Sequence, residues 1–196
     1  MRVLLIDHGG PDTTSLVGAL EGLEAACDVC PADGLELAEI LRRKPRRILL
    51  APGLRAPEDC RIARQIVQEL AGQVPILGIG LGMHVIASVS GARLVPAKKR
   101  RRKDLSLLLR HDGKGLFEAL PSPLALGRDD APLALEGGDD PPPFLEYSAW
   151  SMDGGAILGL RLSGLGVEGL QVLPPSFLTP VGADLLFNFL YRSQTW

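Results

Sequence analysis

The chain has 196 residues, of which 46% are hydrophobic and 22% charged, and its net charge is −2 at pH 7. These values are typical of one globular domain, expected here to span residues 1–196, and they exclude a disordered or fibrous protein. Three cysteines are too few for a disulfide scaffold and suit a reducing compartment, so we expect a cytoplasmic protein. No apolar run reaches roughly 18 residues, which excludes a membrane-spanning helix. We expect no metal and no cofactor.

The first half of the sequence alternates buried strands with amphipathic helices. Short apolar runs are typical of strands buried on both faces at 3–7, 28–31, 47–51 and 74–79. Apolar residues at helical spacing predict helices at 13–23, 35–43, 57–70 and 83–89. This alternation predicts an α/β fold with a parallel sheet, in which ligands bind beyond the carboxyl ends of the strands. The informative loops are therefore 8–12, 52–57 and 78–83.

The second half of the sequence has a different pattern. Short strand-like runs are separated by clusters of Gly, Pro and Asp, and they lie at 94–95, 105–109, 124–126, 133–135, 144–149, 156–162 and 167–172. We expect these runs to add antiparallel β structure to the parallel sheet. A last helix is predicted from Pro180 onward, with leucines and a phenylalanine at helical spacing.

The stretch 74–84 runs from a predicted strand through a glycine-spaced turn into a helix. A dinucleotide-binding turn needs a glycine where Met83 stands, and a phosphate-binding loop needs a Gly-Lys-Ser/Thr sequence that is absent. The spacing instead fits a nucleophile elbow, in which a strained residue between two glycines projects its side chain above the sheet. Gly80 occupies the nucleophile position, and glycine has no side chain with which to attack a substrate.

Six segments, in order along the chain, carry a resemblance to one family: Leu-Ile-Asp at 5–7, Ala-Pro-Gly-Leu-Arg-Ala-Pro-Glu-Asp at 51–59, Val-Pro-Ile-Leu-Gly at 74–78, His-Asp-Gly-Lys-Gly-Leu-Phe at 111–117, Glu-Gly-Leu-Gln-Val at 168–172 and Asn-Phe at 188–189. The chain resembles a class I glutamine amidotransferase, in the branch of anthranilate synthase component II and the aminodeoxychorismate synthase amidotransferase subunit. The resemblance implies a flavodoxin-like fold, an open, mostly parallel sheet with helices on both faces and a small antiparallel β extension.

The resemblance also implies a catalytic triad of Cys, His and Glu. In this chain the matching positions are Gly80, Leu173 and Pro175, none of which can ionise. The positions that match the oxyanion loop and substrate pocket are Gly53, Leu54, Arg55, Leu81 and His84. A thiolate nucleophile, a histidine base and its orienting acid act together in such hydrolysis. We therefore expect a degenerate protein with its triad lost and no glutaminase activity.

Family members supply ammonia to a partner synthase, so the resemblance implies a chorismate-using partner similar to anthranilate or aminodeoxychorismate synthase component I. Our first hypothesis is a non-catalytic binding or regulatory subunit of such a synthase. One alternative is a working amidotransferase subunit with a non-standard nucleophile. Another is a stand-alone module that binds a small ligand in the emptied pocket. A homo-oligomer is compatible with each hypothesis.

The three cysteines offer few substitutes for the missing nucleophile. Cys60 stands in the predicted first turn of a helix, where a thiolate would be favoured, although a small structural residue is the commoner interpretation. Cys27 and Cys30 have the spacing of a redox or metal motif, but no second pair of ligands accompanies them.

A run of six basic residues interrupts an otherwise acidic chain: Lys98, Lys99, Arg100, Arg101, Arg102 and Lys103. Without these six, 15 of the 21 basic residues remain against 23 acidic ones. The run is interpreted as a solvated loop, with contact to an acidic protein or to nucleic acid as the alternatives. The scarcity of aromatic residues disfavours nucleic acid.

Overall fold

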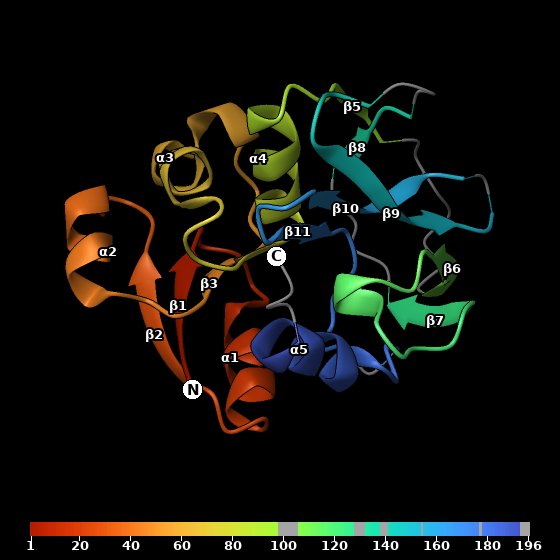
Figure 1. Ribbon diagram of the computed structural model, residues 1–196, viewed down its shortest axis with the longest axis horizontal. Helices are drawn as coiled ribbons and strands as arrows, with labels where there is room; N and C mark the ends of the chain where they lie inside the picture. Colours follow the sequence, from red (N-terminus) through yellow and green to blue (C-terminus); the bar gives the residue numbers. More distant parts are fainter. Residues whose placement is uncertain (98–105, 128–131, 138–140, 154, 177, 193–196) are drawn as a thin grey trace.

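A computed structural model describes residues 1–97, 106–127, 132–137, 141–153, 155–176 and 178–192 (Figure 1). The basic run at 98–103 lies outside the described residues. Within the described parts, no helix is both long and apolar enough to cross a membrane.

The first half alternates strands and helices as the sequence predicts. Its elements are β1 (Arg2–Asp7), α1 (Thr13–Glu21), β2 (Ala26–Pro31), α2 (Leu37–Arg43), β3 (Ile48–Leu50), the short helix η1 (Pro57–Asp59), α3 (Arg61–Leu70), β4 (Ile76–Ile79) and α4 (Leu81–Val89). Strands β1, β3 and β4 are apolar and almost wholly buried, because helices cover both of their faces.

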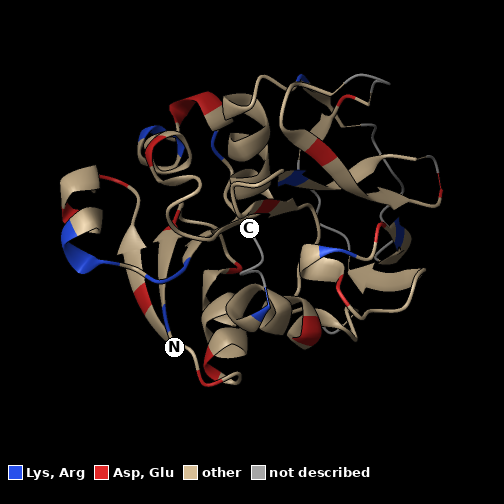
Figure 2. Ribbon diagram, viewed as in Figure 1, with Lys and Arg blue, Asp and Glu red and all other residues tan. Residues whose placement is uncertain are grey.

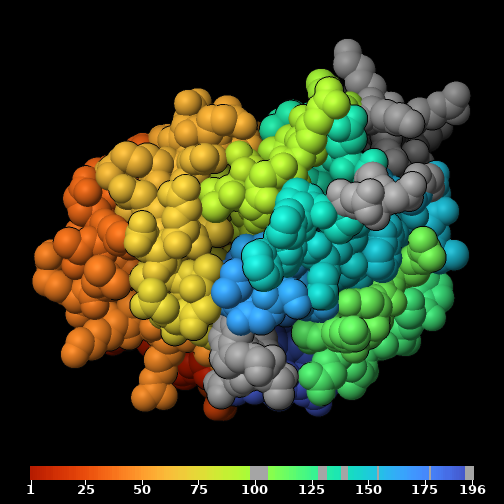
Figure 3. Space-filling model, turned by 45° about the horizontal axis from the view of Figure 1, so that its top comes forward, coloured from red at the N-terminus to blue at the C-terminus, as the bar shows by residue number. Residues whose placement is uncertain are grey.

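The second half is made mainly of short strands. Its elements are β5 (Leu94–Pro96), β6 (Ser106–His111), the short helix η2 (Gly115–Phe117), β7 (Leu124–Gly127), β8 (Leu133–Leu135), β9 (Leu145–Ser151), β10 (Ile157–Leu162), β11 (Val167–Leu170) and α5 (Gly182–Tyr191). In the space-filling view, this half (green to blue) forms one side of the molecule and the first half (red to yellow) forms the other (Figure 3).

All of these strands belong to one sheet, whose main order is β2-β1-β3-β4-β11-β10-β9-β6-β7. Strands β2, β1, β3, β4 and β11 run parallel, and the pairings beyond β11 are antiparallel. The fold is therefore the α/β, flavodoxin-like sheet with an antiparallel extension. The antiparallel prediction for 167–172 is only half right, because β11 pairs antiparallel with β10 but parallel with β4.

The sheet separates two apolar cores. Side chains alternate along a strand, so Leu4 and Ile6 of β1 pack with α3 and α4, whereas Val3 and Leu5 pack with α1 and α5. Figure 1 shows these helix pairs on opposite sides of the parallel strands. Burial of both faces holds the carboxyl ends of the parallel strands in fixed positions, and the candidate site is built at those ends.

Close backbone contact positions α4 on the sheet. A Cβ atom at Gly82 would overlap the carbonyl oxygen of Leu50 on β3, and one at Gly78 would overlap the backbone of Gly82. Only glycine lets the first turn of α4 lie this close to β3 and β4.

This contact predicts that an alanine at position 82 strongly destabilises the fold. Gly82→Ala is expected to lower the free energy of unfolding by about 1–3 kcal/mol, since the overlap involves backbone that cannot move aside. Gly18→Ala is the matched control. It lies within α1 with no atom within 4 Å of the added methyl group, so it should raise stability by about 0.5–1 kcal/mol. Urea unfolding measures the stability of both variants, and equal changes in the free energy of unfolding would contradict the prediction.

Candidate functional site

The candidate site lies where the parallel strands end. The N–H of Ala51, just after β3, donates to the Ile6 carbonyl of β1 at 3.1 Å. The N–H of Gly80, just after β4, donates to the Leu170 carbonyl of β11 at 2.9 Å. These bonds place the loops after β1, β3, β4 and β11 at one edge of the sheet.

Gly80 forms a sharp turn between β4 and α4, with φ 56° and ψ −111°. Its carbonyl accepts the first helical bond of α4, from the N–H of His84 at 3.1 Å. A residue with a side chain would be strained by about 1–3 kcal/mol in such a conformation, and glycine is not. The backbone thus has the shape of an elbow, but no side chain projects from it.

Leu173 and Pro175 follow β11. The Leu173 side chain packs against the core beneath α1 and α5, and its carbonyl accepts bonds from Thr179 Oγ1 at 2.9 Å and Ser176 N–H at 3.1 Å. Pro175 is half-buried. Neither side chain can donate or accept a proton.

The loop after β3 divides the predicted pocket residues into two groups. Gly53 packs against His8 and Leu81, where a Cβ atom would approach the His8 Cβ to 2.8 Å and the Leu81 Cδ2 to 2.9 Å. Leu54 points into solvent with 85% of its surface exposed. Arg55 turns away to Asp33 in a bidentate contact, at 2.6 Å for Nη1, which holds the pKa of Asp33 below its ordinary value. The structure therefore brings together Gly53 and Leu81 but not Leu54 and Arg55.

Two buried histidines lie at this edge. His84 is 2% exposed and His8 is 5% exposed, and in the described part of the chain neither Nε2 atom has a hydrogen-bond partner. The Nδ1 atom of His8 bonds to the Ala51 carbonyl at 3.1 Å. Burial lowers the pKa of both rings, although contacts with the Ala51 carbonyl for His8 and with the Gln171 side chain for His84 oppose the shift, so both rings are neutral at pH 7. Sequence reasoning gave His8 no role, although its place directly after β1 was a usable signal.

The cysteines do not supply a nucleophile to the elbow. Cys60, between η1 and α3, is 3% exposed, and its Sγ contacts the Ala56 carbonyl at 3.5 Å. Burial raises the pKa of its thiol to about 11, which is opposite to the activated thiolate considered from the sequence. Cys27 and Cys30 pack into different cores on the two faces of the sheet, so they do not form a pair.

The burial of Cys60 predicts how the thiols react. At pH 7.5 fewer than about one Cys60 thiol in a thousand is ionised, so iodoacetamide should leave it unmodified in the native protein and modify it after unfolding in urea. Half-buried Cys27 should be labelled first. Mass spectrometry of the labelled peptides checks this order. Faster native labelling of Cys60 than of Cys27 would contradict the assignment.

The described residues offer no group of three or more His, Cys, Asp or Glu side chains arranged to hold a metal ion. What the edge contains is a glycine turn with backbone donors, two neutral imidazoles and apolar walls. Such a set can position a small polar molecule, but the elbow itself carries no thiol or hydroxyl nucleophile.

The family model for class I glutamine amidotransferases matches residues 4–193, and the chain belongs to this family. It is 35% identical over 190 residues to aminodeoxychorismate synthase component 2 of Escherichia coli, covering 97% of this chain and 100% of that protein. It is 34% identical over 192 residues to anthranilate synthase component 2 of Thermus thermophilus, covering 97% and 92%. A solved glutamine amidotransferase structure from Thermotoga maritima superposes with a TM-score of 0.79 at 18% identity, covering 98% of this chain and 97% of that one, which shows a shared fold.

Proposed function

We propose that this chain is a non-catalytic, amidotransferase-like subunit that binds and regulates a chorismate-using synthase without hydrolysing glutamine. The observation that carries the proposal is that Gly80 occupies the nucleophile position of the turn. The turn has the backbone shape of a nucleophile elbow, with φ 56° and ψ −111°, and offers no atom that could attack a carboxamide.

The other two triad positions support the same conclusion. Hydrolysis by a thiol needs a base to take its proton and an acid to orient that base. Leu173 packs against an apolar core, and neither Leu173 nor Pro175 has an ionisable group, so these two positions supply neither the base nor the orienting acid. The alternative of a non-standard nucleophile is disfavoured because Cys60 is buried with a raised thiol pKa.

The partner is proposed from the relatives, which are named as second components of aminodeoxychorismate and anthranilate synthases. The partner would be the matching first component, working with free ammonia. We propose further that residues 1–196 form one domain and that it works in a reducing compartment such as the cytoplasm, in keeping with its three free cysteines.

Reconstitution with the first-component synthase of the same organism tests this function. We expect a stable complex that makes product from ammonium salts and chorismate but not from glutamine and chorismate. Binding should change the kcat or KM of the synthase for ammonia, because a regulatory subunit must alter its partner. No association by size-exclusion chromatography at micromolar concentration would contradict the proposed partner.

One observation favours a second candidate function, a small-ligand module. The unpartnered Nε2 atoms of His8 and His84 are buried polar groups that a ligand could satisfy. A rise in Tm with glutamine, glutamate or chorismate-derived acids, in the absence of any synthase, would favour this candidate. The rise should disappear in His84→Phe, which removes the Nε2 atom of His84 and leaves that of His8 in place.

A further inference from the structure

A second polar site lies at the opposite edge of the sheet, where β11 begins. A cleft of about 470 Å³ opens there between the turn after β6, the turn joining β10 and β11, and the end of α5. Its walls include Lys114, Arg161 and Glu168. In Figure 2 the basic segment of β10 (blue) lies beside the acidic segment of β11 (red) within the sheet. Nothing in the proposed function uses this cleft.

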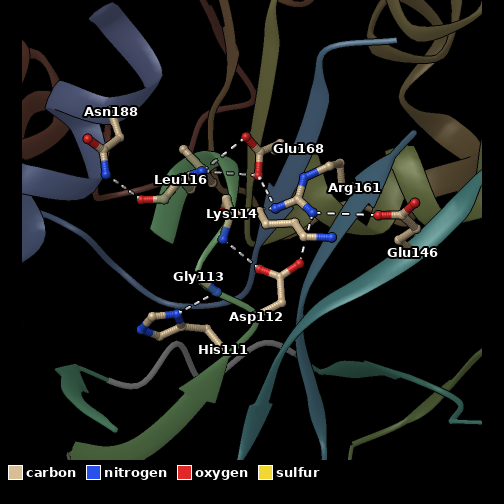
Figure 4. A network of polar contacts seen from close by, with 9 residues as sticks. All are labelled: His111, Asp112, Gly113, Lys114, Leu116, Glu146, Arg161, Glu168 and Asn188. Carbon is tan, nitrogen blue, oxygen red and sulfur yellow. Dashed lines mark hydrogen bonds and ion pairs between the residues drawn. The ribbon is translucent and has the colours of Figure 1, made fainter. Parts of the chain in front are cut away.

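Glu168 of β11 is the buried centre of the site, with 6% of its surface exposed (Figure 4). Its Oε1 and Oε2 atoms accept the N–H of Leu116 at 3.1 and 3.3 Å. Its contact with Arg161 Nη2 is longer, at 3.4 Å. On the other side of the same turn, Asn188 Nδ2 of α5 donates to the Leu116 carbonyl at 2.9 Å. Leu116 is thus held between β11 and α5.

Arg161 of β10 stays anchored without Glu168. Its Nη1 donates to Asp112 Oδ2 at 2.9 Å, and its Nη2 donates to the Lys114 carbonyl at 2.8 Å. Glu146 of β9 is farther away, at 3.6 Å. The Arg161 guanidinium therefore contacts three carboxylates.

The other neighbours of Glu168 add little charge beneath it. Leu77 of β4 pairs with Glu168 in register and is uncharged. The remaining charged groups around the cleft are Lys114, Glu118 and Arg192, and the titratable ring of His111 accepts the Gly113 N–H at Nδ1 at 3.1 Å.

Gly115 lies directly against the Glu168 carboxylate, and we name the segment Gly113–Gly115 the strap. Gly115 lies so close that a Cβ atom there would overlap Glu168 Oε1. Gly113 has φ 77° and Gly115 has φ 57°, so both ends of the strap are glycines in the left-handed region. The residues that follow are fixed differently, because Leu116 and Phe117 are fully buried in the core. The strap can therefore move without exposing apolar side chains, and lifting it breaks the bond from the Lys114 N–H to Asp112 Oδ1 at 3.0 Å.

We propose that the strap is a proton-linked lid: ionisation of Glu168 favours a lifted strap, which admits water to the carboxylate and widens the cleft. A charged carboxylate under the strap loses hydration that its long contacts at 3.1–3.4 Å only partly replace. Lifting three residues restores that hydration; Arg161 loses its bond to the Lys114 carbonyl but keeps its bond to Asp112.

The direction of the pH dependence follows from linkage. Burial raises the pKa of Glu168 to about 7 in the closed form, against an ordinary value of 4.5, although Arg161 and the Leu116 N–H oppose the rise. The closed form therefore binds the proton more tightly than a lifted, hydrated form. Between pH about 5 and 7 the lifted population should grow up to about tenfold per pH unit, and above about pH 7 it should level off.

Hydrogen exchange of the Leu116 amide tests the lid, because this N–H is bonded to Glu168. After correction for intrinsic exchange, its protection factor should fall up to about tenfold per pH unit between about pH 5 and 7 and then stay level. The Leu4 amide, bonded to the Arg47 carbonyl in the parallel sheet at 2.9 Å, reports global unfolding. Leu116 should exchange much faster than Leu4. Equal protection factors for Leu116 and Leu4 would mean that the Leu116 amide exchanges only through global unfolding, and this result would overturn the proposed lid.

Three variants test the roles of Glu168 and its neighbours. Glu168→Gln keeps the shape but cannot ionise, so Leu116 protection should become independent of pH. Glu146→Gln removes a charge from the same Arg161 at a half-exposed position and should leave the pH dependence in place. Gly115→Ala, whose Cβ would overlap the carboxylate, should lower Leu116 protection at all pH values even if Glu168→Gln fails to fold. An unchanged pH dependence in Glu168→Gln, or full protection in Gly115→Ala, would overturn the proposal.

Discussion

The wild-type protein is expected to lose stability as the pH rises from about 5 to about 7, and Glu168→Gln is expected to abolish this loss. The carboxyl titrates near its ordinary value of 4.5 when unfolded and at about 7 when folded, chiefly because of burial. The folded protein therefore binds this proton more tightly, and its contribution to stability is lost as the pH rises through this range. A difference of about 2.5 pH units corresponds to about 3 kcal/mol. Urea unfolding of the wild type and Glu168→Gln at pH 5, 6, 7 and 8 measures it.

The same pH range contains an opposing contribution from two histidines. His8 and His84 have lowered pKa values through burial, so they favour the folded state as the pH rises through 6.5. Both histidines are present in the wild type and in Glu168→Gln, so the difference between the two curves isolates Glu168. Glu146→Gln is the control, and its free energy of unfolding should depend on pH as that of the wild type does. Parallel curves for the wild type and Glu168→Gln would contradict the burial argument.

Introducing a thiol at the elbow is expected to restore no glutaminase activity. Gly80→Cys supplies a nucleophile, but Leu173 cannot take its proton and Pro175 cannot orient a base. In a serine hydrolase, the loss of triad members that act as a unit lowers kcat on the order of a million-fold. The variant should therefore release ammonia from glutamine at the uncatalysed rate. It should also be less stable by about 1–3 kcal/mol, because a side chain must adopt φ 56° and ψ −111°.

Gly80→Ala is the control that separates strain from chemistry. It imposes the same backbone strain without a thiol, so the two variants should lose similar stability and share the same background rate. Ammonia release is followed with a glutamate dehydrogenase assay, and stability by urea unfolding. Turnover in Gly80→Cys above that in Gly80→Ala would show that the site still holds a working base.

Local patterns of the sequence predict most of the fold. Apolar runs and helical spacing locate the four strands and most helices of the first half, because burial on two faces produces them directly. The single helix predicted at 57–70 is instead divided at Cys60 into η1 and α3. The parallel pairing of β11 with β4 is not predictable in this way. A short apolar run looks the same whether its neighbour runs parallel or antiparallel, since the neighbour is chosen by contacts distant in sequence.

The candidate site is predictable only where a motif fixes the backbone. The glycine spacing around Gly80 defines the elbow, and the same motif brings Leu81 into contact with Gly53. Arg55 belongs to a matching loop, yet an ion pair with Asp33 draws it away. The Glu168 cluster joins β11, β10 and the turn after β6, so no local pattern in the sequence reveals it.

The absence of glutaminase activity is tested by ammonia release from amide-labelled glutamine, measured for the purified wild-type chain alone and in complex with a first-component synthase and chorismate. We expect release at the uncatalysed rate in both cases, because the elbow residue is Gly80. Sustained turnover in either case, proportional to the concentration of this chain, would contradict it.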